Sequence, residues 1–262
     1  MNSVSFMIRA AAIAMSIAAA TQAHAAPEEV QVYMDELNKP GEIGLDLHVN
    51  DVLRGNASVD YPGAESALHR WRVTPEFSLG IGHGFEFGAY LPLATIAPDG
   101  VMRAEGAKMR VKWLAPHKDE GFYWGANLEV GRVSSRLDQN PWNGELKMIA
   151  GWRKGRVVLA TNGNFDFTIN GPQPGPVTFD LDMKAGYKVA KDLTLGMESY
   201  HGFGPLRDPG QFRSQDQATY LVADTHLGKW DVNAGVGKGY GGNRDNLVFK
   251  LVLGVPLPQL RR

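Results

Sequence analysis

From Glu42 onward, apolar and polar residues alternate with a period of two along almost the whole sequence. In residues 42–53, one face carries Ile43, Leu45, Leu47 and Val49, and the other carries Gly44, Asp46, His48 and Asn50. Successive side chains of a β-strand point to opposite faces, so this alternation is typical of strands with one apolar and one polar face. No stretch beyond the N-terminal segment shows a helical period with capping residues. The sequence therefore predicts an all-β fold.

Twelve alternating runs can be counted, and they are long for strands. They span residues 42–53, 69–81, 84–96, 101–114, 121–133, 142–153, 156–168, 177–190, 193–204, 217–228, 230–240 and 245–257. Strands of soluble proteins have about five or six residues, whereas a tilted strand that crosses a bilayer needs about 9–11. An even strand number is the rule for single-chain outer-membrane barrels. We therefore predict a transmembrane antiparallel up-and-down β-barrel of about 12 strands.

The connections between these runs alternate between short turns and longer links. The short turns fall at residues 81–84, 115–121, 153–156, 190–193 and 228–230. Most of the other links are longer, at residues 54–68, 134–141, 170–176 and 204–216. Outer-membrane barrels have short periplasmic turns and longer external loops. The same arrangement here would place both ends of the barrel chain on the periplasmic side.

All six tryptophans fall in the apolar register of a predicted strand and close to one of its ends. They are Trp71, Trp113, Trp124, Trp142, Trp152 and Trp230. The alternative is that they pack in the core of a soluble β-protein, but core tryptophans should favour the middle of strands. Aromatic girdles at the two headgroup levels are characteristic of membrane barrels. We therefore predict that these residues are membrane-interface aromatics.

If the apolar faces contact lipid, the polar faces line the interior of the barrel. The lumen-lining candidates are Asp46, Arg70, Arg72, Glu76, Lys108, Arg110, Lys112, Glu129, Asp180, Asp182, Lys184 and Glu198. Both charge signs occur in similar number, so the sequence indicates no single-sign selectivity filter. The lumen either holds water or is closed by ion pairs. The basic residues of run 101–114 beside Arg70 and Arg72 would suit an anionic solute, but we favour their pairing with neighbouring acids.

The N-terminal residues divide into two segments. Residues 1–25 resemble a bacterial secretory signal peptide, with Arg9, an apolar stretch over residues 10–20 and small residues at Ala23-His24-Ala25. Residues 26–41 follow, and they could remain in the periplasm or enter the barrel as a partial plug. The barrel itself would extend over residues 42–262. The expected localisation is the outer membrane, reached after cleavage of the signal peptide.

The composition and motifs exclude several classes of function. The absence of Cys excludes disulfide frameworks, thiolate metal centres and cysteine nucleophiles. A net charge of -1 argues against a nucleic-acid partner, which would require a basic face. The histidines show no metal-ligand spacing, and the sequence contains no Gly-x-Ser-x-Gly elbow. We therefore predict a protein that is not an enzyme, with no catalytic residue, no metal site and no cofactor.

A family resemblance rests on two stretches, Glu36 to Asn50 and Tyr90-Leu91-Pro92-Leu93, together with the signal peptide and the alternating strands. The mature chain resembles proteobacterial outer-membrane β-barrels associated with aromatic-degradation pathways, a broad family of transporters. The resemblance implies a passive channel for small molecules and a partnership with the barrel-assembly machinery. That machinery usually recognises a C-terminal aromatic residue, whereas this sequence ends in Arg262 and has Phe249 within its last predicted strand.

The predicted function is that of an outer-membrane channel or transporter for small molecules. Its expected partners are outer-membrane lipid, the barrel-assembly machinery and a solute that the sequence does not identify. Two alternatives stay open. One is a structural or surface-interaction barrel with a closed lumen, and the other is a soluble periplasmic β-sandwich that binds a ligand between its sheets.

Overall fold

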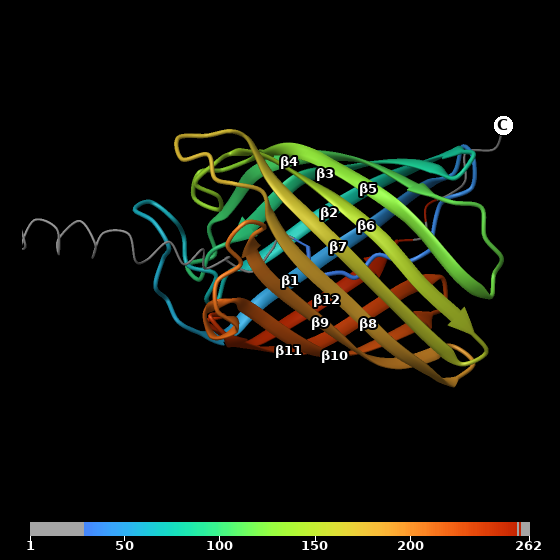
Figure 1. Ribbon diagram of the computed structural model, residues 1–262. Helices are drawn as coiled ribbons and strands as arrows, with labels where there is room; N and C mark the ends of the chain where they lie inside the picture. Colours follow the sequence, from blue (N-terminus) through green and yellow to red (C-terminus); the bar gives the residue numbers. More distant parts are fainter. Residues whose placement is uncertain (1–28, 256, 258–262) are drawn as a thin grey trace, which may run out of the picture.

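The computed structural model describes residues 29–255 and 257, and they form one closed β-barrel (Figure 1). The strands are β1 (Ile43–Gly55), β2 (Trp71–Gly82), β3 (Phe85–Ile96), β4 (Met102–Leu114), β5 (Gly121–Val133), β6 (Trp142–Lys154), β7 (Val157–Asn170), β8 (Thr178–Ala190), β9 (Leu193–Pro205), β10 (Asp216–Leu227), β11 (Trp230–Gly241) and β12 (Asp245–Gly254). The predicted all-β barrel of 12 antiparallel strands is confirmed. The predicted signal peptide lies outside the described residues.

Each strand pairs with its neighbours in sequence, and β1 and β12 close the ring. Their register includes Asp46 opposite Gly254 and Val52 opposite Val248. The strands contain 10 to 14 residues, and most of their ends lie close to those predicted from the alternation. Because the sheet closes on itself, the two-sheet sandwich alternative is wrong. Among the described residues, no helix has the length and hydropathy needed to cross a membrane.

The alternation of the sequence appears as an alternation of exposure. In β2, Arg72, Thr74, Glu76 and Ser78 are buried, whereas the exposed residues are Trp71, Phe77, Leu79 and Ile81. The polar residues point into the barrel, and the apolar residues cover its outer wall. This is the reverse of a soluble protein and the pattern of a barrel that faces lipid.

The two ends of the barrel differ in their connections, as Figure 1 shows. At one end, strands are joined by short turns such as Gly82-His83-Gly84, in which all three residues have a positive φ between 55 and 103°. At the opposite end lie longer loops, including residues 56–70 between β1 and β2 and residues 206–215, which contain the short 3-10 helix η1 (Phe212–Ser214). We refer to these as the turn end and the loop end.

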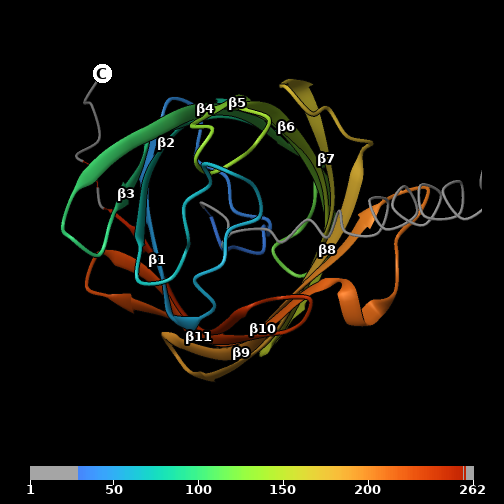
Figure 2. The same cartoon turned by 90° about the vertical axis from the view of Figure 1, so that its left-hand side faces the viewer.

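Residues 29–42, which precede β1, run inside the ring of strands (Figure 2) and reach the turn end, where residues 39–41 are exposed. We call them the lumen segment. Val30, Val32 and Tyr33 are only 2–4% exposed. Val30 packs against Val52, Tyr220 and Val248 among others, while Tyr33 packs against Leu114, Tyr123 and Ile149. The sequence left the position of this segment open between the periplasm and the barrel, and its described part is in the barrel.

Candidate channel lumen

The inner wall of the barrel brings together charged side chains from nearly every strand. Of the lumen-lining candidates, nine are at most 9% exposed: Arg70, Arg72, Glu76, Arg110, Lys112, Glu129, Asp182, Lys184 and Glu198. Asp46, Lys108 and Asp180 are half-buried. Charged groups at such depth require partners, because an unpaired buried charge is costly. Many of these partners belong to two networks on different sides of the barrel, and Lys147 with Glu145 of β6 forms a further pair at 3.3 Å.

The first network joins β1, β2, β3 and β4. Arg110 binds the carboxylates of both Glu76 and Glu86, the latter at 2.8 Å, and Nε2 of His48 lies 3.0 Å from Glu76. A Cβ on Gly88 would lie 2.7 Å from the Arg110 side chain, so this position of β3 needs glycine. Arg110 is therefore held by two acids, and Lys108 has a similar partner in Glu129 at 3.0 Å.

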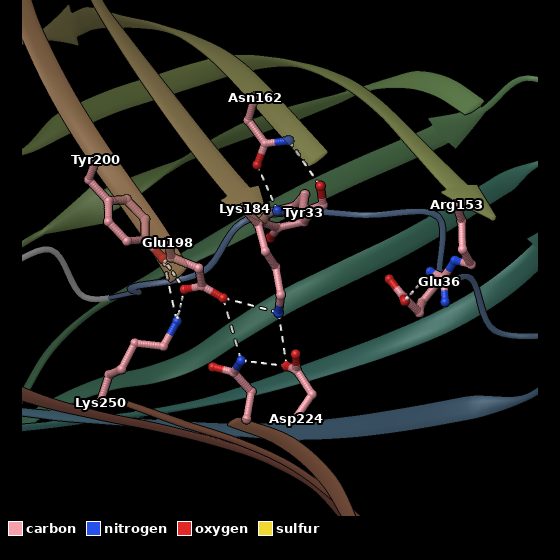
Figure 3. A network of polar contacts seen from close by, with 10 residues as sticks. Tyr33, Glu36, Arg153, Asn162, Lys184, Glu198, Tyr200, Asp224 and Lys250 are labelled. Atoms are coloured by element: carbon pink, nitrogen blue, oxygen red, sulfur yellow. Dashed lines mark hydrogen bonds and ion pairs between the residues drawn. The ribbon is translucent and has the colours of Figure 1, made fainter. Parts of the chain in front are cut away.

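The second network joins β8 to β12 and is drawn in Figure 3. The Glu198 carboxylate lies between two ammonium groups, with Lys184 at 3.1 Å and Lys250 on its other oxygen. Lys184 also contacts Asp224 at 2.8 Å, and the Tyr200 hydroxyl donates to Glu198 at 2.8 Å. All charges in this cluster are compensated within it. It links β8, β9, β10 and β12 from the inside, and Asn233 of the intervening β11 donates to Asp224 at 2.6 Å.

The lumen segment is bound to the wall by backbone hydrogen bonds as well as by side chains. The Tyr33 amide donates to Oδ1 of Asn162 at 2.6 Å, and Nδ2 of Asn162 donates to the Tyr33 carbonyl at 2.9 Å (Figure 3). The Asn38 amide donates to Glu86 at 2.8 Å. Asn162 thus satisfies both polar backbone groups of one residue, as a neighbouring strand would do.

Charged residues of the segment are bound near the turn end. Arg153 of β6 binds Asp35 and also contacts Glu36 at 3.2 Å. The Lys112 ammonium donates to the Glu36 carbonyl at 2.8 Å. Lys112 is therefore occupied by the segment, although the sequence grouped it with Lys108 and Arg110 as one basic cluster.

The Tyr33 ring lies among three cations of the wall. The ammonium groups of Lys147 and Lys112 lie 4.5 and 5.1 Å from the ring centroid, and the Arg110 guanidinium lies 5.9 Å away. Such distances allow attraction between each cation and the ring face. The Tyr33 hydroxyl shares a short hydrogen bond with the hydroxyl of Tyr90. This part of the lumen therefore accommodates a phenol ring.

The loop end is partly covered by residues 56–70, which cross the opening in Figure 2. The Tyr61 hydroxyl donates to the Ser135 carbonyl at 2.9 Å, and on the other side Arg244 contacts Asp60 at 3.3 Å. Burial, together with the nearby carboxylates of Asp138 and Asp60, raises the pKa of Tyr61 to about 12. The raised pKa keeps the phenol a hydrogen-bond donor even at alkaline pH. Arg70 belongs to this region, since it contacts Glu65 of the same loop at 2.9 Å.

The tryptophans lie outside the barrel rather than in its lumen. Trp71, Trp124, Trp142, Trp152 and Trp230 are 37–47% exposed. Trp113 stacks edge-on against Trp124, with 5.2 Å between ring centroids. Trp71, Trp142 and Trp230 are the first residues of their strands. Their placement at a membrane interface stays a prediction.

Some residues of the lumen were not singled out from the sequence. Tyr33, Glu36 and Asn162 were missed because nothing in the sequence indicated which strand the segment would contact. The brief alternation of Val30, Val32 and Met34 was the available signal. Glu29, His48 and Glu76 also converge, with one potential ligand atom of each within 4.8 Å of the others. We assign Glu76 and His48 to the first ion network, because Arg110 already compensates Glu76.

Comparison with known proteins supports the fold and gives no family. No family model matches the chain, and no curated protein matches it. The KdgM porin superimposes with a TM-score of 0.55 at 11% identity, covering 82% of this chain and 99% of the porin. An outer-membrane channel from Pseudomonas putida F1 superimposes with a TM-score of 0.56 at 12% identity, covering 86% of this chain and 99% of the channel. The translocator domain of the autotransporter NalP from Neisseria meningitidis superimposes with a TM-score of 0.50 at 12% identity, covering 85% of this chain and 91% of that domain. The chain thus shares the fold of porin-like outer-membrane barrels.

Proposed function

We propose that this protein is a passive outer-membrane channel for small molecules whose lumen is constricted by its own residues 29–42. The observation that carries the proposal is a closed barrel with an apolar outer wall and a charged inner wall, along which the lumen segment runs. A polar inner wall supports a water-filled path. The similarity to solved porins and channels concerns the fold and is consistent with this function.

The wall has its own partners for most of its charges, which makes displacement of the lumen segment chemically reasonable. Glu198 is compensated by Lys184 and Lys250, and Glu76 by Arg110, without any contribution from the segment. The segment depends on a limited set of contacts, chiefly with Asn162, Arg153 and Lys112. Its withdrawal would leave the barrel wall intact. We therefore propose that the segment controls how wide the path is.

We further propose that small aromatic compounds are among the solutes. The support is the position of the Tyr33 ring, which is surrounded by Arg110, Lys112 and Lys147 and bonded through its hydroxyl to Tyr90. A phenolic solute could occupy the same space when the segment is displaced. This fits the resemblance to barrels associated with aromatic-degradation pathways.

Conductance of the purified protein in planar bilayers tests the proposal. We expect small unitary currents from the wild-type protein and larger currents from a variant that lacks residues 29–37. A second variant, Tyr33→Ala with Asn162→Ala, removes the Tyr33 ring and the Asn162 hydrogen bonds of the segment and serves if the deletion impairs folding. Both are first checked for folded mobility on unheated SDS gels. Absence of current and of solute flux from folded samples of all three would instead support a structural barrel with a closed lumen.

A further inference from the structure

A hollow of about 680 Å³ lies on the outside of the barrel at its loop end. Leu53 and Arg54 of β1, Lys238 of β11, Leu247 of β12, and Leu68 and His69 of the loop are among its lining residues. Val52 and Val248 are 1–2% exposed because they face the interior. Their neighbour Leu247 must therefore face outward, since successive side chains of a strand alternate. The register of β1 shifts between Val52 and Arg54, so that Leu53 is an extra residue and Arg54 is on the same outward side as its partner Leu247.

The strand register brings two of these cations to either side of one leucine. Arg54 is paired with Leu247 across β1 and β12, and Gly237 is paired with Val248 across β11 and β12. Because β11 and β12 are antiparallel, the next residue of β11, Lys238, is opposite Leu247. Neighbouring strands are about 4.8 Å apart, so the two cationic residues start about 10 Å apart. Both side chains are long enough to reach one anion above Leu247.

Neither cation has a partner within the part of the chain that the structure describes. Arg54 and Lys238 are exposed, and no ion pair or hydrogen bond of either side chain is formed among residues 29–255. His69 has an acidic neighbour in Asp51. Lys238 stands between the outward-facing Val236 and Tyr240, which are 49% and 37% exposed. A lysine on this apolar face would be unfavourable in the hydrocarbon core of a bilayer. At the level of the lipid headgroups it is tolerated, because its ammonium group can reach the polar layer.

The surface next to the cations is apolar and aromatic. Trp71 and Phe249 stack edge-on, with 6.2 Å between ring centroids. Phe249 follows Leu247 on the same outward face of β12, one step further from the loop end. Asp51 is opposite Phe249 on this face, but it is only 4% exposed and has His69 beside it. The exposed part of the patch therefore places positive charge at the rim and apolar side chains below it. This is the complement of an amphiphile with an anionic headgroup.

We propose that this hollow binds the phosphate headgroup of an anionic lipid in the leaflet at the loop end. Arg54 and Lys238 donate hydrogen bonds to the phosphate oxygens, and the fork geometry of arginine suits two of them at once. The acyl chain lies along Phe249 and Trp71. The site is on the outer wall, so it is independent of what passes through the lumen.

Native mass spectrometry of the protein in neutral detergent tests this site. The probe lipid is dimyristoyl phosphatidate, with dimyristoyl phosphatidylcholine and inorganic phosphate as the comparison ligands. We expect the wild-type protein to retain phosphatidate in preference to phosphatidylcholine. The double variant Arg54→Gln with Lys238→Gln should retain about tenfold less, because two charge-assisted hydrogen bonds are lost.

The matched control is Arg207→Gln with Arg213→Gln, which removes two exposed cations from the loop between β9 and β10 at the same end. All variants are compared only after their folded mobility on unheated SDS gels is verified. Equal loss of phosphatidate in the control would show general charge attraction and overturn the proposal. Displacement of the lipid by an equal concentration of inorganic phosphate would show a free-anion site and would also overturn it.

Discussion

At the residue scale, stability depends on buried charges that are compensated within small groups. Glu198 is 1% exposed and is the carboxylate that Lys184 and Lys250 share. A buried ion pair contributes little in net terms against its desolvation cost, but removing one partner leaves the other charge uncompensated. The effect of a substitution therefore depends on which charge it leaves behind.

Replacement of Glu198 by glutamine should be strongly destabilising. Within the described residues the change leaves Lys250 with no carboxylate partner, and we expect the free energy of unfolding to fall by about 3–5 kcal/mol. Urea titration of the protein in lipid vesicles measures this free energy of unfolding. The control is Asp231→Asn, whose carboxylate pairs with His226 at an exposed position and should change stability by about 1 kcal/mol or less. Similar small losses in both variants would contradict the role given to Glu198.

At the element scale, the lumen segment needs a glycine in the wall. A Cβ on Gly80 would lie 2.2 Å from the Lys39 carbonyl and 2.3 Å from the Asn38 carbonyl, both of which are backbone atoms that cannot swing away. The Gly41 amide also donates to the Gly80 carbonyl at 2.7 Å. This position of β2 thus permits the segment to lie directly against the barrel wall.

Gly80→Ala should therefore loosen the segment while leaving the barrel closed. Such overpacking costs about 1–3 kcal/mol, and we expect faster protease cleavage within residues 29–42 together with larger channel currents. Gly163→Ala is the matched control, because its Cβ would meet only the Phe179 ring, at an ordinary distance of 3.4 Å. Equal cleavage rates in wild type and both variants would rule out the close contact at Gly80.

The strands were more predictable from the sequence than the lumen contacts. Alternation depends on neighbouring residues only, so the run at 142–153 predicted β6 almost to its ends. The contact between Tyr33 and Asn162 joins residues 129 positions apart. No local pattern indicates such a pairing, because it depends on the depth to which the segment enters the closed barrel. Lys112 was recognised as inward-facing for the same local reason, but its partner Glu36 was not.

At the scale of the whole molecule, the outer wall has the properties of a surface in contact with lipid. Exposed apolar residues occur on every part of the wall, including Phe77, Met109, Leu128, Leu195 and Val236. On a soluble protein, an apolar surface of this extent would cause aggregation. A bilayer accounts for it, and the tryptophans at the ends of strands would then lie at the headgroup level.

Quenching of tryptophan fluorescence by brominated lipids tests this orientation. We expect strong quenching when bromine lies near the ester carbonyls and weaker quenching when it lies near the ends of the acyl chains. Protein unfolded in urea with the same lipids is the control and should show little quenching at any depth. If quenching were strongest with bromine near the ends of the acyl chains, the six tryptophans would not form interfacial girdles.

The location of the lumen segment also constrains the order in which the barrel can be assembled. The segment directly precedes β1, and β1 pairs with β12 to close the ring, which is the one pairing between described strands that are distant in sequence. Before this pairing forms, the sheet is an open trough in which residues 29–42 can settle sideways against Asn162 and Arg153. After it forms, the same residues would have to be threaded lengthwise through an opening lined by charged side chains. We therefore expect the segment to be in place inside the sheet before β1 and β12 join.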